Sequence, residues 1–87
     1  MNTNFALLAR FNSPIVELKV VSKEFFGITP KTAEQMAKAH NFPVPTFKLR
    51  ESERCPTMVN LSDLAAHIDK KYEDARETWA SVNPQLQ

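Results

Sequence analysis

A short segment of this chain carries polar side chains that could hydrogen-bond to the edges of DNA bases. The segment from Pro30 to about His40 is predicted to be helical, and its outward face holds Lys31, Thr32, Gln35 and Lys38. Glutamine can bond adenine through two hydrogen bonds, lysine can donate to guanine, and threonine can contact the thymine methyl group. The same residue types are common on any helix face exposed to water. Only their place in a larger motif favours base recognition.

Two arginines further along the chain could contact phosphate or a narrow minor groove. Arg50 and Arg54 flank the polar stretch that contains Glu51 and Glu53. The planar guanidinium group suits both kinds of contact. The intervening glutamates support a second interpretation, in which the four side chains form a local salt-bridged loop.

The sole glycine marks the junction between two predicted helices. Apolar residues with helical spacing precede Gly27, and this helix is predicted from about Glu17 to Phe26. A glycine at this point indicates a positive φ angle at the helix end. Thr29 followed by Pro30 is typical of an N-cap and a first helical position.

The second helix is predicted from Pro30 to about His40, with Ala33, Met36, Ala37 and His40 facing inward. A helix, a short turn and a second helix form a helix-turn-helix.

The rest of the chain predicts a hairpin and a third helix. Thr46–Arg50 alternates polar and apolar residues, and Thr57–Val59 is predicted as the returning strand of a β-hairpin, or wing. Asn60 can cap a long amphipathic helix. Phe5–Arg10 fits either a strand or a helical turn, and Ile15-Val16 fits a short strand. We therefore expect an α+β fold, a small winged helix-turn-helix domain of three helices with a β-hairpin wing. The domain is expected to extend over residues 1–82, and residues 83–87 are expected to form a frayed tail.

Composition narrows the class of protein. The 87 residues carry a net charge of +1, but residues 1–54 hold eight basic and five acidic side chains, whereas residues 55–87 hold three and five. This asymmetry favours a mildly basic face on the first part of the chain. Cys55 is the only cysteine, and His40 and His67 are too few for a metal site. We expect no cofactor, no metal and no enzymatic activity. No signal peptide or membrane-spanning stretch is present in the sequence, so we expect a cytoplasmic protein.

Two aromatic residues lie late in the third predicted helix. Tyr72 and Trp79 could close the core, or they could dock a second subunit, because aromatic residues are enriched at interfaces. A single domain of this size offers a small reading surface, so self-association on DNA is expected.

An ordered set of short motifs extends over most of the chain. It consists of Met1-Asn2-Thr3, Phe5, Leu7-Leu8-Ala9, Leu18 to Phe26 with Gly27, Pro43-Val44-Pro45, Phe47-Lys48-Leu49-Arg50 with Ser52, and Val59 to Ala65 with Ile68-Asp69. With this set, the chain from Met1 to about Ala75 resembles the pyocin activator family, small phage-type regulators of bacterial prophages. The resemblance implies an activator of prophage-derived genes that binds DNA. The architecture is also similar to excisionases, winged-helix factors that bend DNA and direct an integrase.

Three functions remain open from the sequence. The first is a sequence-specific regulator of transcription, an activator of prophage or bacteriocin-type genes. The second is an excisionase-like recombination directionality factor, and the third is a protein-interaction adaptor that does not bind DNA. The expected partners are double-stranded DNA, further copies of the chain, and RNA polymerase or an integrase, with no membrane.

Overall fold

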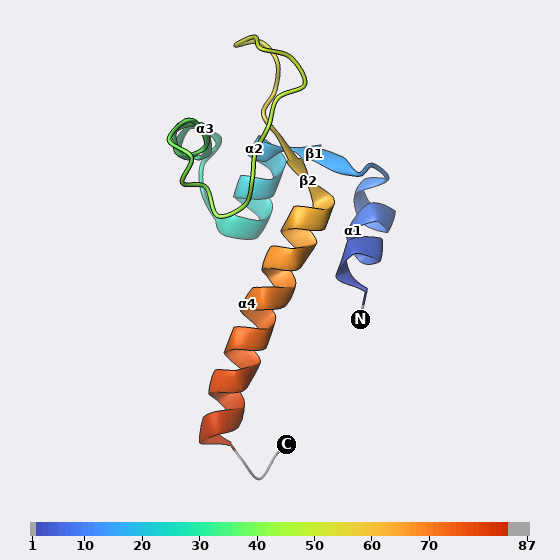
Figure 1. Cartoon of the computed structure of the whole chain (residues 1–87), viewed down its shortest axis with the longest axis vertical. Helices are drawn as coiled ribbons and strands as arrows, with labels where there is room; N and C mark the ends of the chain where they lie inside the picture. Colours follow the sequence, from blue (N-terminus) through green and yellow to red (C-terminus); the bar gives the residue numbers. More distant parts are fainter. Residues whose placement is uncertain (1, 84–87) are drawn as a thin grey trace.

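The computed structural model describes residues 2–83, so the predicted tail lies, beyond Asn83, outside the described residues. Helices and a small sheet alternate along the chain (Figure 1). In order, the elements are α1 (Thr3–Phe11), β1 (Ile15–Glu17), α2 (Leu18–Val21), the π-helix η1 (Ser22–Phe26), α3 (Pro30–Lys38), β2 (Met58–Asn60) and α4 (Leu61–Val82). The α+β class is therefore confirmed. The helix α1 adds to the three helices that were expected.

The first element is a helix because both of its ends are capped. The Asn2 side chain accepts a hydrogen bond from the Phe5 backbone N–H at 2.9 Å. At the other end Asn12 adopts φ of 55°, and its N–H donates to the Leu8 carbonyl at 2.7 Å. Asparagine tolerates this left-handed conformation better than most residues, so it ends the helix cleanly. These caps decide between the two structures that the sequence left open for this segment.

The predicted junction at the glycine is confirmed. Gly27 has φ of +64°, and the N–H of Ile28 donates to the Ser22 carbonyl at 3.0 Å. Thr29 caps α3 by accepting from the Thr32 N–H at 3.4 Å, and Pro30 occupies the first turn. The first helix of this unit begins at Leu18 as α2 and continues as η1 to Phe26. Two helical segments thus meet at a three-residue turn.

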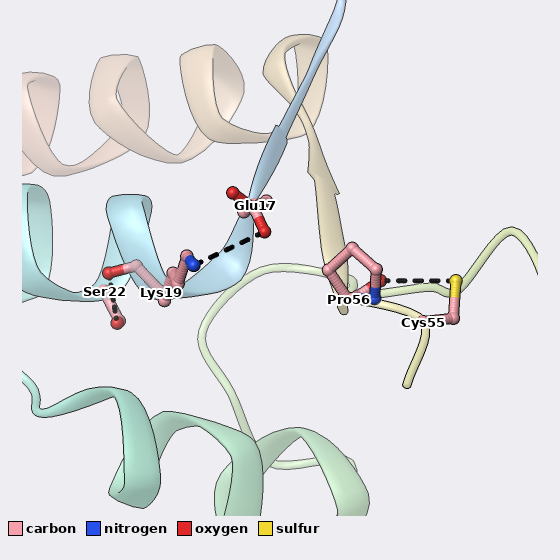
Figure 2. A network of polar contacts seen from close by, with 5 residues as sticks. All are labelled: Glu17, Lys19, Ser22, Cys55 and Pro56. Atoms are coloured by element: carbon pink, nitrogen blue, oxygen red, sulfur yellow. Dashed lines mark hydrogen bonds and ion pairs between the residues drawn. The ribbon is translucent and has the colours of Figure 1, made fainter. Parts of the chain in front are cut away.

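Local polar contacts hold the start of α2 (Figure 2). Lys19 forms an ion pair with Glu17 at 3.7 Å, across the boundary between β1 and α2. The Ser22 hydroxyl donates to the Lys19 carbonyl at 3.3 Å, which satisfies a side chain that is completely buried. Strand and helix therefore join without a loop.

The predicted β-hairpin is wrong in its pairing. β2 pairs antiparallel with β1, with Ile15 opposite Asn60, Val16 opposite Val59 and Glu17 opposite Met58. The segment predicted as the outgoing strand contributes one bridge, in which Phe47 and Met58 exchange backbone hydrogen bonds of 3.0 and 2.7 Å. Between residues 48 and 56 the backbone forms two local hydrogen bonds, from the Ser52 N–H to the Arg50 carbonyl at 3.0 Å and from the Cys55 N–H to the Ser52 carbonyl at 3.1 Å, and no further bridge. The segment that was predicted as a wing is therefore a long loop closed by a single residue pair.

The core lies where α2, α3, β2 and α4 meet. Completely or almost completely buried apolar side chains come from each of these elements, and they are Leu18, Val21, Ala33, Val59, Leu61 and Leu64. His40 was expected to pack inward but is exposed, because α3 ends at Lys38 and His40 turns away with φ of 57°. His67 is half-buried, with its ring 5.4 Å from that of Phe26.

The helix α1 packs against the N-terminal half of α4. Leu7 is buried in this contact, and the Thr3 hydroxyl donates to the Asp69 carboxylate at 2.5 Å. Arg10 forms an ion pair with Glu24 of η1. Beyond the level of α1, α4 extends alone from the rest of the molecule (Figure 1).

Candidate nucleic-acid interface

The outer face of α3 presents the side chains that were predicted to contact DNA. Lys31, Thr32, Gln35 and Lys38 are all exposed. Within residues 2–83, no hydrogen bond or ion pair engages the side chains of Lys31, Gln35 or Lys38. Their donors and acceptors are therefore free to bind a ligand.

Thr32 differs from its neighbours on this face. Its hydroxyl oxygen accepts a hydrogen bond from the Thr29 hydroxyl at 3.0 Å, next to the N-cap contact. The Thr32 hydroxyl oxygen is therefore already engaged within the helix cap. Thr32 as a whole is exposed, and its methyl group is the part suited to an apolar contact.

The opposite side of α3 packs against the core through small residues. Ala33 is completely buried, and Ala37 is 9% exposed. Short side chains allow the helix backbone to approach α2 closely. The nine-residue helix is thus held on the core by one side and presents its polar side to the solvent.

One hydrogen bond ties α3 to the end of the long loop. The Thr57 hydroxyl, which is buried, donates to the Glu34 carboxylate at 2.9 Å. Sequence reasoning missed this pair, because the partners are 23 residues apart and no local spacing connects them. The Glu34 carboxylate therefore has a structural hydrogen bond to Thr57, although Glu34 belongs to the helix that carries the candidate DNA-contacting residues.

The loop over residues 48–56 closes on itself through Ser52. The Lys48 ammonium donates to the Ser52 carbonyl at 3.3 Å, and the Cys55 N–H donates to the same carbonyl at 3.1 Å. The Ser52 hydroxyl in turn accepts from the Arg54 N–H at 3.2 Å. A loop with this many internal contacts has a defined shape without being part of a sheet.

The two arginines of the loop lie around one shared depression. Arg50 and Arg54 line it together with Ser52 and Cys55. The predicted alternative was a salt-bridged loop, and it is wrong for the described residues, where the only ion pairs within 4 Å are Arg10–Glu24 and Lys19–Glu17. Both guanidinium groups therefore remain available to an anionic partner.

An exposed leucine stands between two cations of the same loop. The alternation of polar and apolar residues over Thr46–Arg50 is that of a half-buried strand, in which Phe47 and Leu49 would share one face. Phe47 is half-buried, but Leu49 is 68% exposed between Lys48 and Arg50. The chain turns after the single bridge at Phe47, so the strand alternation does not continue. The one feature of the sequence that indicates an exposed Leu49 is its position between two basic residues, Lys48 and Arg50.

The loop and α3 form one end of the molecule. A hollow between them is lined by Lys38 and His40 on one side and by Lys48 and Thr57 on the other. In Figure 1 both elements lie at the end of the fold that is opposite to the C-terminal end of α4. The polar face of α3 and the basic loop can therefore meet the same partner.

The described residues were also compared with the requirements of a metal site, a reactive cysteine and a membrane-spanning helix. No group of three or more His, Cys, Asp or Glu side chains could hold a metal ion there. Cys55 is half-buried, with its Sγ 3.8 Å from the Pro56 carbonyl oxygen (Figure 2). Among the same residues, no helix combines the length and the apolar character that crossing a membrane requires.

Comparison with known proteins places the chain in a family. No curated protein and no solved structure shows significant similarity to the chain. A family model described as "Pyocin activator protein PrtN" matches residues 3–75, which include α3, the loop and the first part of α4. The match extends over most of the 87 residues. The chain belongs to the pyocin activator protein PrtN family.

Proposed function

We propose that this protein activates transcription of pyocin-type genes by binding specific sites in double-stranded DNA. Membership of the pyocin activator family supports the regulatory role. The observation that carries the DNA-binding part is the outer face of α3, where Lys31, Gln35 and Lys38 are exposed and free on a helix docked by Ala33 and Ala37. A second helix of this kind, following a tight turn, is the element that enters the major groove in helix-turn-helix proteins.

Each residue of this face has a distinct role in the proposal. Gln35 bonds adenine through its amide, and Lys31 donates to guanine or to a phosphate. The Thr32 methyl group contacts a thymine methyl group, because its hydroxyl oxygen is already bonded to Thr29. Lys38, at the end of α3, contacts the backbone phosphates.

The loop makes the second contact in this proposal. Arg50 and Arg54 bind phosphates or a narrow minor groove. Leu49, between Lys48 and Arg50, enters the minor groove, since exposed apolar side chains next to basic ones act as wedges between base steps. The loop then positions the protein on the duplex while α3 selects the sequence.

Binding to DNA from the genomic neighbourhood of its own gene tests the proposal. We expect specific binding that weakens as salt rises. Replacement of Gln35 by Ala should lower specific affinity by about 1–3 kcal/mol with little effect on non-specific DNA. Lys31→Ala should either do the same or weaken both. Lys70→Ala, an exposed change on α4, is the matched control.

The loop needs its own test, because it could be purely structural. Double replacement of Arg50 and Arg54 by Ala should reduce the salt dependence of binding by about 1 to 2 units of log K against log salt. An unchanged slope would remove the arginines from the interface. If the parent protein binds no DNA at any salt concentration, the adaptor function is favoured instead.

The exposed Leu49 also favours a second candidate, the excisionase-like factor that bends DNA for an integrase. A minor-groove wedge kinks the duplex, and a recombination factor uses such kinks. Measurement of the bend angle with the parent and with Leu49→Ala separates the contributions of the wedge and of α3. Genome-wide mapping of bound sites then decides between promoters and attachment sites.

A further inference from the structure

The distal part of α4 carries an apolar stripe that nothing else in residues 2–83 covers. The stripe recurs at alternating intervals of four and three residues, and its members are Leu61, Ala65, Ile68, Tyr72, Ala75, Trp79 and Val82. α1 and the core cover its beginning. Further along, Tyr72 is 57% exposed, Trp79 48% and Val82 72%. Figure 1 shows this half of α4 extending away from every other element.

This spacing is that of a coiled-coil seam. A repeat of four and three residues keeps apolar side chains on one face of a helix toward a partner helix. An isolated helix of about 12 residues is marginal in water, so the end of α4 gains stability from a partner. Tyr72, Ala75, Arg76 and Trp79 together line a shallow groove on this face.

We propose that the occupant is the same segment of a second copy, packed antiparallel around a two-fold axis. With the axis near residue 77, Trp79 of each copy packs on Ala75 of the other. In the same register Tyr72 packs on Val82. Each large ring thus meets a small side chain, and the surface is complementary to itself, as a two-fold interface requires. α1 covers α4 as far as Asp69, which confines the overlap to this distal segment.

A parallel pair fits less well. It would place Trp79 on Trp79 and Ala75 on Ala75, which leaves a gap at the alanine layer. It would also place Lys71 opposite Arg76 of the other copy on both flanks, which gives two like-charge contacts. The antiparallel pair has one such contact, between the two copies of Arg76, and faces Thr78 with Thr78 on the other flank. Size and charge therefore both favour the antiparallel arrangement.

The small size of this surface predicts when the pair forms. A buried aromatic side chain covers about 150–250 Å², so the exposed portions of Tyr72 and Trp79 offer roughly 100 Å² each. The total stays below the ~1,200 Å² of a stable interface. Association is therefore weak in solution and strengthens when two copies are held on neighbouring sites. This last step rests on the proposed DNA binding, whereas the pairing itself does not.

Thiol cross-linking without DNA tests the pairing and its direction. Cys55, the only cysteine, is first replaced by Ser. Tyr72→Cys and Val82→Cys proteins are then mixed at high concentration and oxidised. The antiparallel pair predicts mainly the mixed disulfide, which mass spectrometry distinguishes from either homodimer. Ser81→Cys, on the outer side of the helix, is the control and should cross-link several-fold less.

Homodimers in place of the mixed product would overturn the antiparallel arrangement. Cross-linking of Ser81→Cys at the same level as the seam positions would overturn the pairing altogether. Trp79→Ala should abolish the weak association seen by sedimentation and the cooperativity on two-site DNA, whereas Phe5→Ala, which removes a more exposed ring from α1, should preserve both. If Trp79→Ala behaves as the parent, the face belongs to another partner.

Discussion

The two ends of the molecule expose opposite kinds of surface. α3 turns its small apolar residues inward and its free polar groups outward, and the loop beside it adds three cations. The distal half of α4 exposes two aromatic rings and a valine. A polar face on a well-packed helix suits a polar, charged partner, whereas an apolar face on an unsupported helix suits another helix. The exposure of a face does not by itself identify its partner. The chemistry of the exposed side chains, and whether the helix behind them is packed on the core, distinguish the partner of α3 from that of the distal α4.

The largest expected effect comes from removing the core beneath both ends. Leu64 is completely buried at the start of α4, so Leu64→Ala should destabilise the fold by about 2–5 kcal/mol through lost burial and a residual cavity. Thermal or urea unfolding measures the change. Both DNA binding and self-association should then fail together. Survival of one without the other would show that the two ends are supported separately.

A smaller loss of stability is expected at the turn that orients α3. Gly27→Val should cost about 1–3 kcal/mol, because a β-branched residue resists the left-handed conformation. No atom lies within 4 Å of a Cβ built at this position, so the cost arises in the backbone and not from a clash. Gly27→Asn, which tolerates positive φ, should cost clearly less. Equal melting temperatures for the two variants would contradict this explanation.

Next in size is the tie between α3 and the loop. Thr57→Val keeps the shape of the side chain but removes the hydrogen bond to Glu34, which should cost about 0.5–1.5 kcal/mol of stability. Specific DNA affinity should fall with it, because α3 loses one of its anchors. Self-association through α4 should remain as in the parent. A loss of association would mean that the two ends communicate.

The smallest effect on stability is expected at the far end of α4. Trp79→Ala should change the unfolding free energy of the monomer by less than about 0.5 kcal/mol, because the ring lies away from the core. The difference in unfolding free energy between Trp79→Ala and Leu64→Ala, on the same helix, tests most directly that the distal end of α4 lies outside the core. A large loss in dilute solution would show instead that Trp79 belongs to the folded core.

The features that the sequence predicted well depend on neighbouring residues. Gly27, Thr29 and Pro30 act within one or two turns, so their roles follow from local chemistry. The long helix from Leu61 was likewise evident from Asn60 and the apolar spacing. Tyr72 and Trp79 could be placed on that helix, but their exposure depends on where α1 ends.

The features that failed depend on distant partners. The pairing of β2 with β1 brings residues 15–17 beside 58–60, and no pattern within 46–59 contains that information. The orientation of Leu49 failed for the same reason, because it followed from the wrong strand. The four outward residues of α3 that were predicted to contact DNA are exposed, as expected, but their contact with DNA remains a prediction. The roles of Arg50 and Arg54 also remain untested.

The absence of any loop between β2 and α4 has a mechanical consequence. Asn60 is both the last residue of the strand and the N-cap of the helix, so α4 is a lever rooted directly in the sheet. With 22 residues it is about 33 Å long. A rotation of roughly 5° at its root would therefore displace Val82 by about 3 Å. Any change in the orientation of the sheet is therefore enlarged at the distal end of α4.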